Sequence, residues 1–425
     1  MEVIQDTYRT INFGPQEYEV PNEWKVLKIK ETSTLKGRIG WQGLTTKEYL
    51  KEGDYFLITG TDFKNGRIDW ENCHFVDQDR FDQDTKIQIK KNDILITKDG
   101  TIGKVAIIAS ELSKPGTLNS GVFVLRPTNK DYLPIFMYYY LNSFFFSSFI
   151  SQIKAGSTIA HLYQKDFEKY TFLVPSIQEQ QKIAAILSTL DEQISNTNKI
   201  IEKSKELKKG LMQKLFSEGI GHTEFKDTKI GRIPKDWEVK TLEDVFIFNN
   251  GKGHEQFISE NGDYIVVNSK FISQEGRVKK FSNKQMSPLL VKDITMVMSD
   301  IPNGRALAKC FMIEENNKYS LNQRICGLRL KNEVKDDVRF FFYNLNRNKG
   351  FLKYNDGVSQ TNLRKSEVLG CLLAYPPSKE QQKIAAILSE ADAKIEKEQE
   401  QKAQLELLKK GLMQQLLTGK KRVKV

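Results

Sequence analysis

The sequence predicts an α+β protein with a pseudo-twofold internal repeat, in which two strand-rich domains are each followed by one long helix. Three observations predict this class. Short β-branched or alternating runs, such as FLITG and KVAIIA in the first domain and YIVV and RICGLRL in the second, are typical of strands. A further segment occurs twice almost unchanged. The apolar residues of that segment follow the heptad spacing of a long helix.

The repeated segment is identical over long stretches. Residues 179–188 and 380–389 both read EQQKIAAILS, and residues 207–213 and 408–414 both read LKKGLMQ, at one offset of 201. Two matches in the same register exclude chance. Weaker matches precede them in the same order along the chain, such as VPNEW with IPKDW and GDYFLITG with GDYIVVNS. The chain therefore alternates variable domains with near-invariant segments.

Each near-invariant segment reads as a helix of about 38 residues, which is roughly 57 Å long. A proline stands before each copy and a glycine follows each copy, as expected at helix ends. These residues are Pro175, Pro376, Gly219 and Gly419. A helix this long with a narrow apolar seam needs a partner, and the simplest reading packs the two helices together. The seam residues are Ile183, Leu187, Leu190, Ile194 and Ile201, then Ile384, Leu388, Ala391 and Ile395.

These boundaries divide the chain into four parts. We expect a first variable domain at 1–175 and a central helix at 176–218. A second variable domain follows at 219–375, and a C-terminal helix with a basic tail at 376–425. A chain of 425 residues is long enough for two or three domains with substantial cores.

Composition favours a folded protein with a polyanionic partner. Hydrophobic residues make up 39% and charged residues 28%, which excludes a disordered or collagen-like chain. Lys and Arg number 65 against 54 Asp and Glu, for a net charge of +11. The four cysteines lack C-x-x-C spacing and the histidines do not cluster with them, so we expect neither a disulfide framework nor a metal site. The N-terminus lacks the pattern of a secretory signal, and we expect a cytoplasmic protein.

One uncharged stretch, residues 132–150, has the length of a membrane span. Its counterpart in the second half, residues 337–352, contains three basic residues and one acidic residue. We therefore predict that both are aromatic-rich helices packed against a sheet.

Basic, amide and hydroxyl residues gather in the turns of the variable domains. Arg and Lys suit guanine edges, Asn and Gln suit adenine edges, and all of them suit phosphate. For any single residue, an ordinary solvated loop is the alternative. The candidates for DNA contact are Lys36, Arg38, Trp41, Gln42, Lys64, Arg67, Lys98, Thr101, Lys104, Ser157, Thr158, His161, Asn249, Asn250, Lys252, His254, Asn303, Arg305, Asn322, Gln323, Arg324, Ser359, Gln360, Thr361 and Asn362.

Residues off the helix seam are as unchanged between the copies as the seam itself. A solvated face has no packing reason to stay fixed, so we expect an outside partner to contact both copies in the same way. Recent duplication is the alternative, but the flanking domains have diverged widely. The predicted partner-binding residues are Glu179, Gln180, Gln181 and Lys182, and Glu380, Gln381, Gln382 and Lys383.

Three patterns that resemble catalytic motifs fail on closer reading. The G-T-I-G-K sequence at 100–104 lacks the spacing of a phosphate loop. Y-P-P-S at 375–378 is matched by V-P-S-I in the first copy, and Asp236, Glu238 and Lys240, which resemble a nuclease constellation, are matched by Asn22, Glu23, Trp24 and Lys25. We therefore expect no catalytic residue, no bound cofactor and no enzyme activity in this chain.

Two divergent domains, each followed by a P-x-x-x-E-Q-Q-x-I-x-x-x-L helix that ends in K-K-G-L-M-Q, closely resemble the specificity subunit of Type I restriction-modification systems. The G-x-T-I-G-K and G-S-T loops of the first domain also resemble that family. The second domain departs from it, with DIPNGR at 300–305 and GVSQTN at 357–362.

The resemblance implies a non-catalytic DNA-binding subunit. Each variable domain would be a target-recognition domain that reads one half of a bipartite, asymmetric site on double-stranded DNA. The two helices would pair as an antiparallel coiled coil and separate the domains. Two methyltransferase subunits, together with restriction subunits, would dock on this chain, and S-adenosylmethionine, ATP and Mg²⁺ would belong to those partners. The rival hypotheses are a coiled-coil scaffold with two protein-binding domains and a complete single-chain restriction enzyme, and the missing cofactor motifs argue against the latter.

Overall fold

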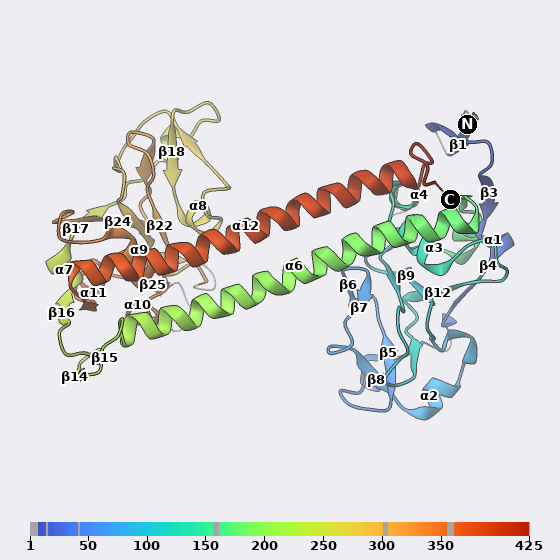
Figure 1. Ribbon diagram of the computed structural model, residues 1–425, viewed down its shortest axis with the longest axis horizontal. Helices are drawn as coiled ribbons and strands as arrows, with labels where there is room; N and C mark the ends of the chain where they lie inside the picture. The colour runs from blue at the N-terminus through green and yellow to red at the C-terminus, as the bar shows by residue number, and fades with distance from the viewer. Residues whose placement is uncertain are drawn as a thin grey trace. The chain divides into compact units, whose positions relative to one another are not determined.

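The computed structural model describes residues 7–13, 16–40, 43–155, 161–300, 305–354 and 361–424. The chain divides into two compact units, drawn in Figure 1. Unit 1 contains Met1–Asn198 and Gln401–Val425, and unit 2 contains Lys199–Glu400. Each long helix contributes one part to each unit.

Unit 1 is built on two sheets. A four-stranded antiparallel sheet has the order β10-β9-β12-β4, and a three-stranded sheet has the order β11-β5-β8. Within the second sheet, β11 pairs parallel with β5. The strands are β4 (Ser33–Gly37), β5 (Tyr55–Ile58), β8 (His74–Val76), β9 (Ile94–Thr97), β10 (Val105–Ile107), β11 (Gly116–Leu118) and β12 (Val122–Pro127).

Unit 2 repeats this topology strand for strand. Its four-stranded sheet has the order β17-β24-β20-β22, and its three-stranded sheet, β19-β18-β23, again contains one parallel pair. The strands are β17 (Phe246–Asn250), β18 (Tyr264–Val267), β19 (Phe281–Ser282), β20 (Ile294–Val297), β22 (Cys310–Met312), β23 (Tyr319–Leu321) and β24 (Ile325–Leu330). The predicted α+β class and internal repeat are both confirmed.

The four-stranded sheet of unit 1 lies between two hydrophobic cores. Alternate residues of β9 and β12 point to opposite faces, so Ile94 and Phe123 enter one core while Leu95 and Val124 enter the other. This double burial explains why the central strands read as continuous apolar runs in the sequence.

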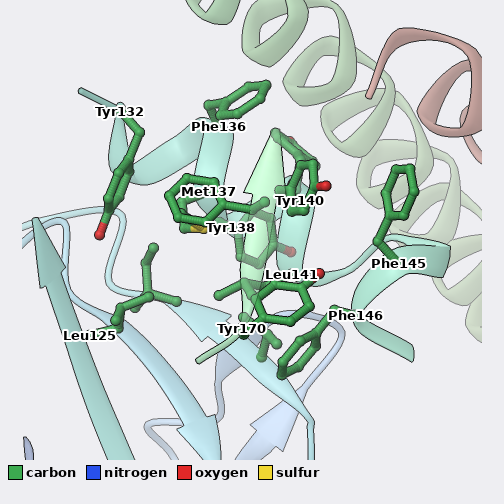
Figure 2. Packing of buried hydrophobic residues seen from close by; sticks show 14 of the residues in the cluster. Leu125, Tyr132, Phe136, Met137, Tyr138, Tyr140, Leu141, Phe145, Phe146 and Tyr170 are labelled. Atoms are coloured by element: carbon green, nitrogen blue, oxygen red, sulfur yellow. The ribbon is translucent and has the colours of Figure 1, made fainter. Parts of the chain in front are cut away.

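Aromatic residues of α3 (Pro134–Leu141) and α4 (Phe144–Ala155) fill the larger core of unit 1, as Figure 2 shows. The helical stretch predicted over 132–150 is therefore buried, but it is two helices rather than one. Their equivalents in unit 2 are α9 (Val338–Leu345) and α10 (Lys349–Leu352). Among the described helices, none is long and apolar enough to cross a membrane.

The long helices are α6 (Ile177–Ser217) and α12 (Ser378–Leu416). In unit 1, Lys409 Nζ lies 2.5 Å from Asp191 Oδ1 and Lys402 Nζ donates to Asn198 Oδ1 at 2.8 Å. A residue further along α6 therefore contacts a residue that comes earlier on α12, so the two helices run antiparallel within this unit. The seam prediction is confirmed, because Ile183, Leu187, Ile201, Ile384 and Leu388 are buried.

Short two-stranded pairs hold the start of each long helix. In unit 1, β13 (Thr171–Val174) pairs with β3 (Lys25–Lys28), and in unit 2, β26 (Leu372–Tyr375) pairs with β16 (Glu238–Thr241). Each pair joins the strand just before a long helix to the start of its variable domain. Two further antiparallel pairs are β1 (Tyr8–Phe13) with β2 (Gln16–Pro21) and β14 (Phe225–Thr228) with β15 (Gly231–Pro234).

The remaining elements are short. They are α1 (Ile29–Thr32), β6 (Phe63–Lys64), β7 (Arg67–Ile68), α2 (Gln78–Asp82), α5 (Gln164–Phe167), α7 (Leu242–Val245), α8 (Ser269–Ser273), β21 (Ser299–Asp300), β25 (Thr361–Asn362) and α11 (Lys365–Leu369), with 3₁₀ turns at Thr46–Glu48, Thr85–Ile87 and Glu255–Phe257.

Candidate nucleic-acid interface and helix surfaces

Two of the predicted loops and the turn before β12 meet at one edge of unit 1. The Lys98 backbone N–H donates to the Gly121 carbonyl at 2.8 Å, and the Leu162 N–H donates to the Lys98 carbonyl at 2.9 Å. Lys98 therefore joins the turn after β9, the turn before β12 and the segment that begins at His161. Thr101 and Lys104 are exposed on the first of these turns. The structure thus brings together four of the predicted DNA-contact residues of unit 1.

Local contacts order this edge. His161 pairs through Nδ1 with the Asp99 carboxylate. Lys98 Nζ lies 4.8 Å from the ring centroid of Phe123, and burial lowers the pKa of Lys98. A cation that is already packed on a ring loses less side-chain freedom when it meets a phosphate or a base.

The equivalent edge of unit 2 is built by the same backbone pattern. The Met298 N–H donates to the Arg324 carbonyl at 3.1 Å, and the Leu363 N–H donates to the Met298 carbonyl at 2.8 Å. Exposed Arg305 and Arg324 lie on two of these loops, and Asn362 on β25 pairs in the ladder with Ser299 on β21.

Strand β17 brings a further loop to the same edge of unit 2. The Lys252 N–H donates to the Leu321 carbonyl at 3.0 Å, and Lys252 forms an isolated bridge with Asn322. The exposed Gln323 donates through Nε2 to Glu255 Oε1 at 3.1 Å. Two loops that are 70 residues apart in sequence therefore form one surface.

The other predicted residues have varied positions. Lys36 is exposed on β4, and Lys64 and Arg67 are exposed on the β6–β7 hairpin. Asn249 and Asn250 end β17, two residues before Lys252. Trp41, Gln42, Ser157, Thr158, Asn303, Ser359 and Gln360, and the side chain of Thr361, lie outside the described residues.

Arg38 does not lie in a solvent-facing turn, and the prediction that placed it there is wrong. Its side chain is 1% exposed. The guanidinium donates to the Leu118 carbonyl at 2.8 Å and to Gln83 Oε1 at 2.9 Å. Burial lowers the pKa of Arg38. Arg38 joins the end of β11 to the α2 region and is a structural residue.

His254 is also buried rather than solvent-facing, so the prediction is wrong here too. It is 0% exposed. Its Nδ1 lies 2.8 Å from the Lys252 carbonyl and its Nε2 lies 2.7 Å from Ser320 Oγ. A carbonyl only accepts, so Nδ1–H donates to it and a neutral Nε2 accepts from the serine. His254 supports the loop that carries Lys252.

The start of α6 is a network of buried polar side chains in unit 1. Glu179 is 1% exposed and accepts from Trp24 Nε1 at 3.2 Å and from Arg422 Nε at 2.8 Å. Gln180 is 0% exposed and accepts from the Leu133 N–H at 2.8 Å. Its amide donates to the carbonyls of Asp131 and Pro175 at 2.9 and 3.0 Å. We call Glu179 and Gln180, with these partners, the unit 1 latch.

The start of α12 forms the equivalent unit 2 latch, defined by Glu380 and Gln381. Glu380 accepts from Trp237 Nε1 at 2.9 Å, from the Ile220 N–H at 2.9 Å and lies 2.9 Å from His222 Nε2. Gln381 is 0% exposed, accepts from the Asp337 N–H at 2.9 Å and donates to the Pro376 carbonyl at 3.0 Å.

The latches correct the prediction that all eight off-seam residues face solvent. Glu179, Gln180 and Gln381 are buried, and the side chain of Glu380 is only 12% exposed. Their identity between the copies therefore has an internal reason. The remaining predicted partner-binding residues, Gln181, Lys182, Gln382 and Lys383, are exposed.

A second repeated contact fixes the long helices to the aromatic helices. Tyr139 Oη donates to Asp191 Oδ2 at 2.8 Å in unit 1, and Tyr343 Oη donates to Asp392 Oδ2 at 2.8 Å in unit 2. Burial raises the pKa of Tyr343 to about 12, so its hydroxyl stays protonated. In unit 2, Asp392 also forms an ion pair with Lys208, whose Nζ lies 2.5 Å from Asp392 Oδ1. This contact was not predicted from the sequence, although its tyrosine and its aspartate both occur in each copy of the repeat.

The helix ends also match. Gly219 and Gly419 have φ values of +65° and +73°, and a Cβ on Gly419 would lie 2.4 Å from Pro21 Cδ. The glycines predicted to follow the helices are therefore required by both backbone conformation and space. Arg422 follows Gly419 and contacts Glu179 in the unit 1 latch, and His222 follows Gly219 and contacts Glu380 in the unit 2 latch.

Within the described ranges, no cluster of His, Cys, Asp or Glu could hold a metal ion. The features defined so far are two units of the same topology, repeated latches that hold two long helices, and loop edges that differ between the units. Such an arrangement defines a protein built from two copies of one scaffold that differ in their loops.

The family model described as the Type I restriction modification DNA specificity domain matches the chain twice, at residues 21–206 and 234–407. The chain therefore belongs to the family of Type I restriction-modification specificity subunits.

Relatives match over all or most of the chain. The Type I restriction enzyme MjaVIII specificity subunit of Methanocaldococcus jannaschii is 30% identical, with 100% of this chain and 99% of that protein covered. The StySPI specificity subunit of Salmonella potsdam is 24% identical over 86% of this chain and 81% of that protein.

Solved structures share the fold. The S subunit of the Type I restriction-modification system of M. genitalium has a TM-score of 0.56 at 20% identity, covering 93% of this chain and 96% of that chain. A chain from a structure of type I R-M complex assembly and conformational transition has a TM-score of 0.57 at 14% identity, covering 94% and 99%.

Proposed function

We propose that this chain is the sequence-specific DNA-binding subunit of a Type I restriction-modification complex and that each unit reads one half of a bipartite, asymmetric target. The observation that supports this most is the contrast within the repeat. Topology, helix contacts and the latch residues on the long helices are the same in both units, whereas the exposed loops at the equivalent sheet edges differ. A duplicated scaffold with unlike loops is suited to two unlike half-sites.

We assign the reading surfaces to the two loop edges. In unit 1 this surface contains Lys98, Thr101, Lys104 and His161. In unit 2 it contains Lys252, Arg305, Asn322, Gln323 and Arg324. Exposed Arg and Lys next to amide side chains provide both phosphate contacts and base-edge donors. Arg38 and His254 support these loops from within and do not belong to the surface.

The chemistry belongs to partner chains in this proposal. The chain itself is non-catalytic and binds no cofactor, while methyltransferase and restriction subunits supply the sites for S-adenosylmethionine, ATP and Mg²⁺. Two methyltransferase subunits dock on the long helices, where Gln181 and Lys182 and their equivalents Gln382 and Lys383 are exposed. The complex acts in the cytoplasm.

Sequencing of methylated bases tests the proposal directly. The chain is expressed with its cognate methyltransferase subunit in a host free of other methylation, and the modified motif is read from the genome. We expect two unequal half-sites separated by a fixed gap. Exchange of residues 1–175 for the domain of another specificity subunit should change one half only. A palindromic motif, or no motif, would contradict the asymmetric two-reader mechanism.

Single substitutions test the surface. Lys104→Ala and Arg324→Ala should each weaken binding to the cognate duplex by about 1–3 kcal/mol where the residue contacts a base. Lys130→Ala and Lys226→Ala, at exposed positions outside these loops, are the matched controls. Affinity for DNA should fall steeply with added salt. A chain whose affinity for DNA is low and independent of salt would favour the protein scaffold instead.

A further inference from the structure

Unit 2 contains a cleft of about 990 Å³, and Lys208 and Tyr343, which contact Asp392, are among the residues that line it. One wall is the last part of α6, from Lys205 to Ser217. The opposite wall runs from the end of α9 through α10, and residues of β26 contribute to the lining. All of these elements belong to the same unit.

The rim of the cleft is strongly basic. Lys209 on α6, Lys229 between β14 and β15, and Lys349 and Lys353 at α10 are exposed. Within the described ranges, none of these four lysines makes an ion pair. Among the residues that line the cleft, Glu367 is the one carboxylate, and it accepts the Arg364 N–H at 2.7 Å. Like charges around a concave surface focus a positive potential, which favours an anionic occupant.

Apolar side chains also line the cleft. Met212 and Phe216 project from α6, and Leu372, Leu373 and Ala374 line the cleft from β26. Phosphates on the outside of a DNA duplex would meet the lysines but leave these side chains bare. An amphipathic helix, about 10–12 Å across with its side chains, would cover the apolar residues with one face and direct carboxylates to the rim. The combined chemistry therefore favours an acidic amphipathic helix over a nucleic acid.

None of the described pockets of unit 1 is as large as this cleft. Met413 and Gln414 on α12 repeat Met212 and Gln213, but the facing residues are Phe144 and Phe145, and the pocket between them measures about 250 Å³. Phe144 is 57% exposed. The helix surface is the same in both units, but six lysines are among the described residues that line the cleft of unit 2, whereas Lys420 alone is among those that line this pocket of unit 1.

We propose that the unit 2 cleft binds an acidic amphipathic helix of the methyltransferase subunit, so that the two docking sites on this chain are unequal. This rests on the proposed function, which places a methyltransferase subunit on each unit. The same partner helix would meet apolar side chains in both units and a larger number of basic side chains in unit 2. The first methyltransferase subunit then binds unit 2 with higher affinity and greater sensitivity to salt, and the second binds unit 1.

The test is a titration of the full chain with its cognate methyltransferase subunit, followed by native mass spectrometry. The wild-type chain should fill in two steps, and added salt should weaken the first step more than the second. The variant K229E/K349E/K353E should lose roughly tenfold or more in affinity at the first step, because three attractive contacts become repulsive. The control K270E/K279E/K280E carries the same charge change at exposed positions outside the cleft and should titrate like the wild type. Circular dichroism shows that each variant is folded.

Four outcomes would overturn the proposal. Equal binding steps in the wild-type chain, or an unchanged first step in the cleft variant, would show that the cleft is not the docking site. If the variant instead lost affinity for a non-specific duplex while still binding the methyltransferase subunit normally, the occupant would be a nucleic acid. If the wild-type chain bound no methyltransferase subunit at all, the docking part of the proposed function would fail as well, and this result differs from a failure confined to the variant.

Discussion

The two latches perform one task with different closing residues. Glu179 and Glu380 each accept a tryptophan Nε1–H and hold the start of a long helix against its variable domain. In unit 1 the closing residue is Arg422, whereas in unit 2 it is His222. The residues that are identical between the two units are therefore those on the long helices. The closing side chain, which comes from the segment after a long helix, differs between the units. Identity between two copies can thus record shared folding contacts as well as a shared partner.

The largest expected effect comes from a charge buried inside the latch. Gln180→Glu would replace an amide that donates to two carbonyls by a carboxylate that repels them. We expect unit 1 to lose about 3–5 kcal/mol of its free energy of unfolding. Hydrogen exchange of β9 and β12 measures unit 1, and exchange of β20 and β24 measures unit 2. The equivalent variant, Gln381→Glu, should lower the free energy of unfolding of unit 2 instead of unit 1.

The neighbouring glutamines provide matched controls. Gln181→Glu and Gln382→Glu make the same chemical change one residue further along, at exposed positions. They should alter the free energy of unfolding by about 0.5 kcal/mol or less. If Gln180→Glu were equally mild, the latch would not hold the helix and its residues would be available to a partner.

The closing residues should give the next largest effects, and these should be unequal. Arg422→Gln leaves the buried Glu179 carboxylate without its cation, and we expect unit 1 to lose about 2 kcal/mol. His222→Gln should cost unit 2 only about 1 kcal/mol, because Glu380 still accepts from Trp237 and from the Ile220 N–H. Urea unfolding followed by exchange in each unit measures both losses. Equal losses would mean that the backbone donor at Ile220 contributes nothing.

The regular parts of this fold could be predicted because their signals are local. The seam from Ile183 to Ile201 follows from spacing alone, and prolines and glycines mark the helix ends. The strand runs follow from β-branched residues that are buried on both faces of a sheet. The repeat then shows that the second half has the same order of elements as the first.

The latches could not be predicted because their partners are far apart in sequence. Glu179 and Arg422 are separated by 243 residues, and nothing near either residue indicates the other. The same reason explains the error at Arg38, which reads like a turn residue until β11 and α2 close around it. The loop edges were predicted in part. The turns were visible in the sequence, but the strand order β10-β9-β12-β4 decides which of them meet.

The smallest expected effect is a pH dependence that belongs to unit 2. Burial lowers the pKa of His254, although the hydrogen bond to the Lys252 carbonyl and the charge of Glu255 act in the opposite direction. Below the ordinary histidine pKa of about 6.5, the unfolded chain therefore binds a proton that the folded unit resists. The contribution of His254 to stability is fully present above that pH and is lost as the pH falls through the lowered folded value. The protection of β20 and β24, measured relative to the intrinsic exchange rate at each pH, should thus fall between pH 7.5 and 5.5 more in the wild type than in His254→Gln, whose amide can still donate to the Lys252 carbonyl and accept from Ser320. Exchange of β9 and β12 should respond to the same change in pH equally in the wild type and in His254→Gln, because His254 lies in unit 2. An identical pH response of β20 and β24 in both proteins would show that the His254 proton is not linked to the folding of this unit.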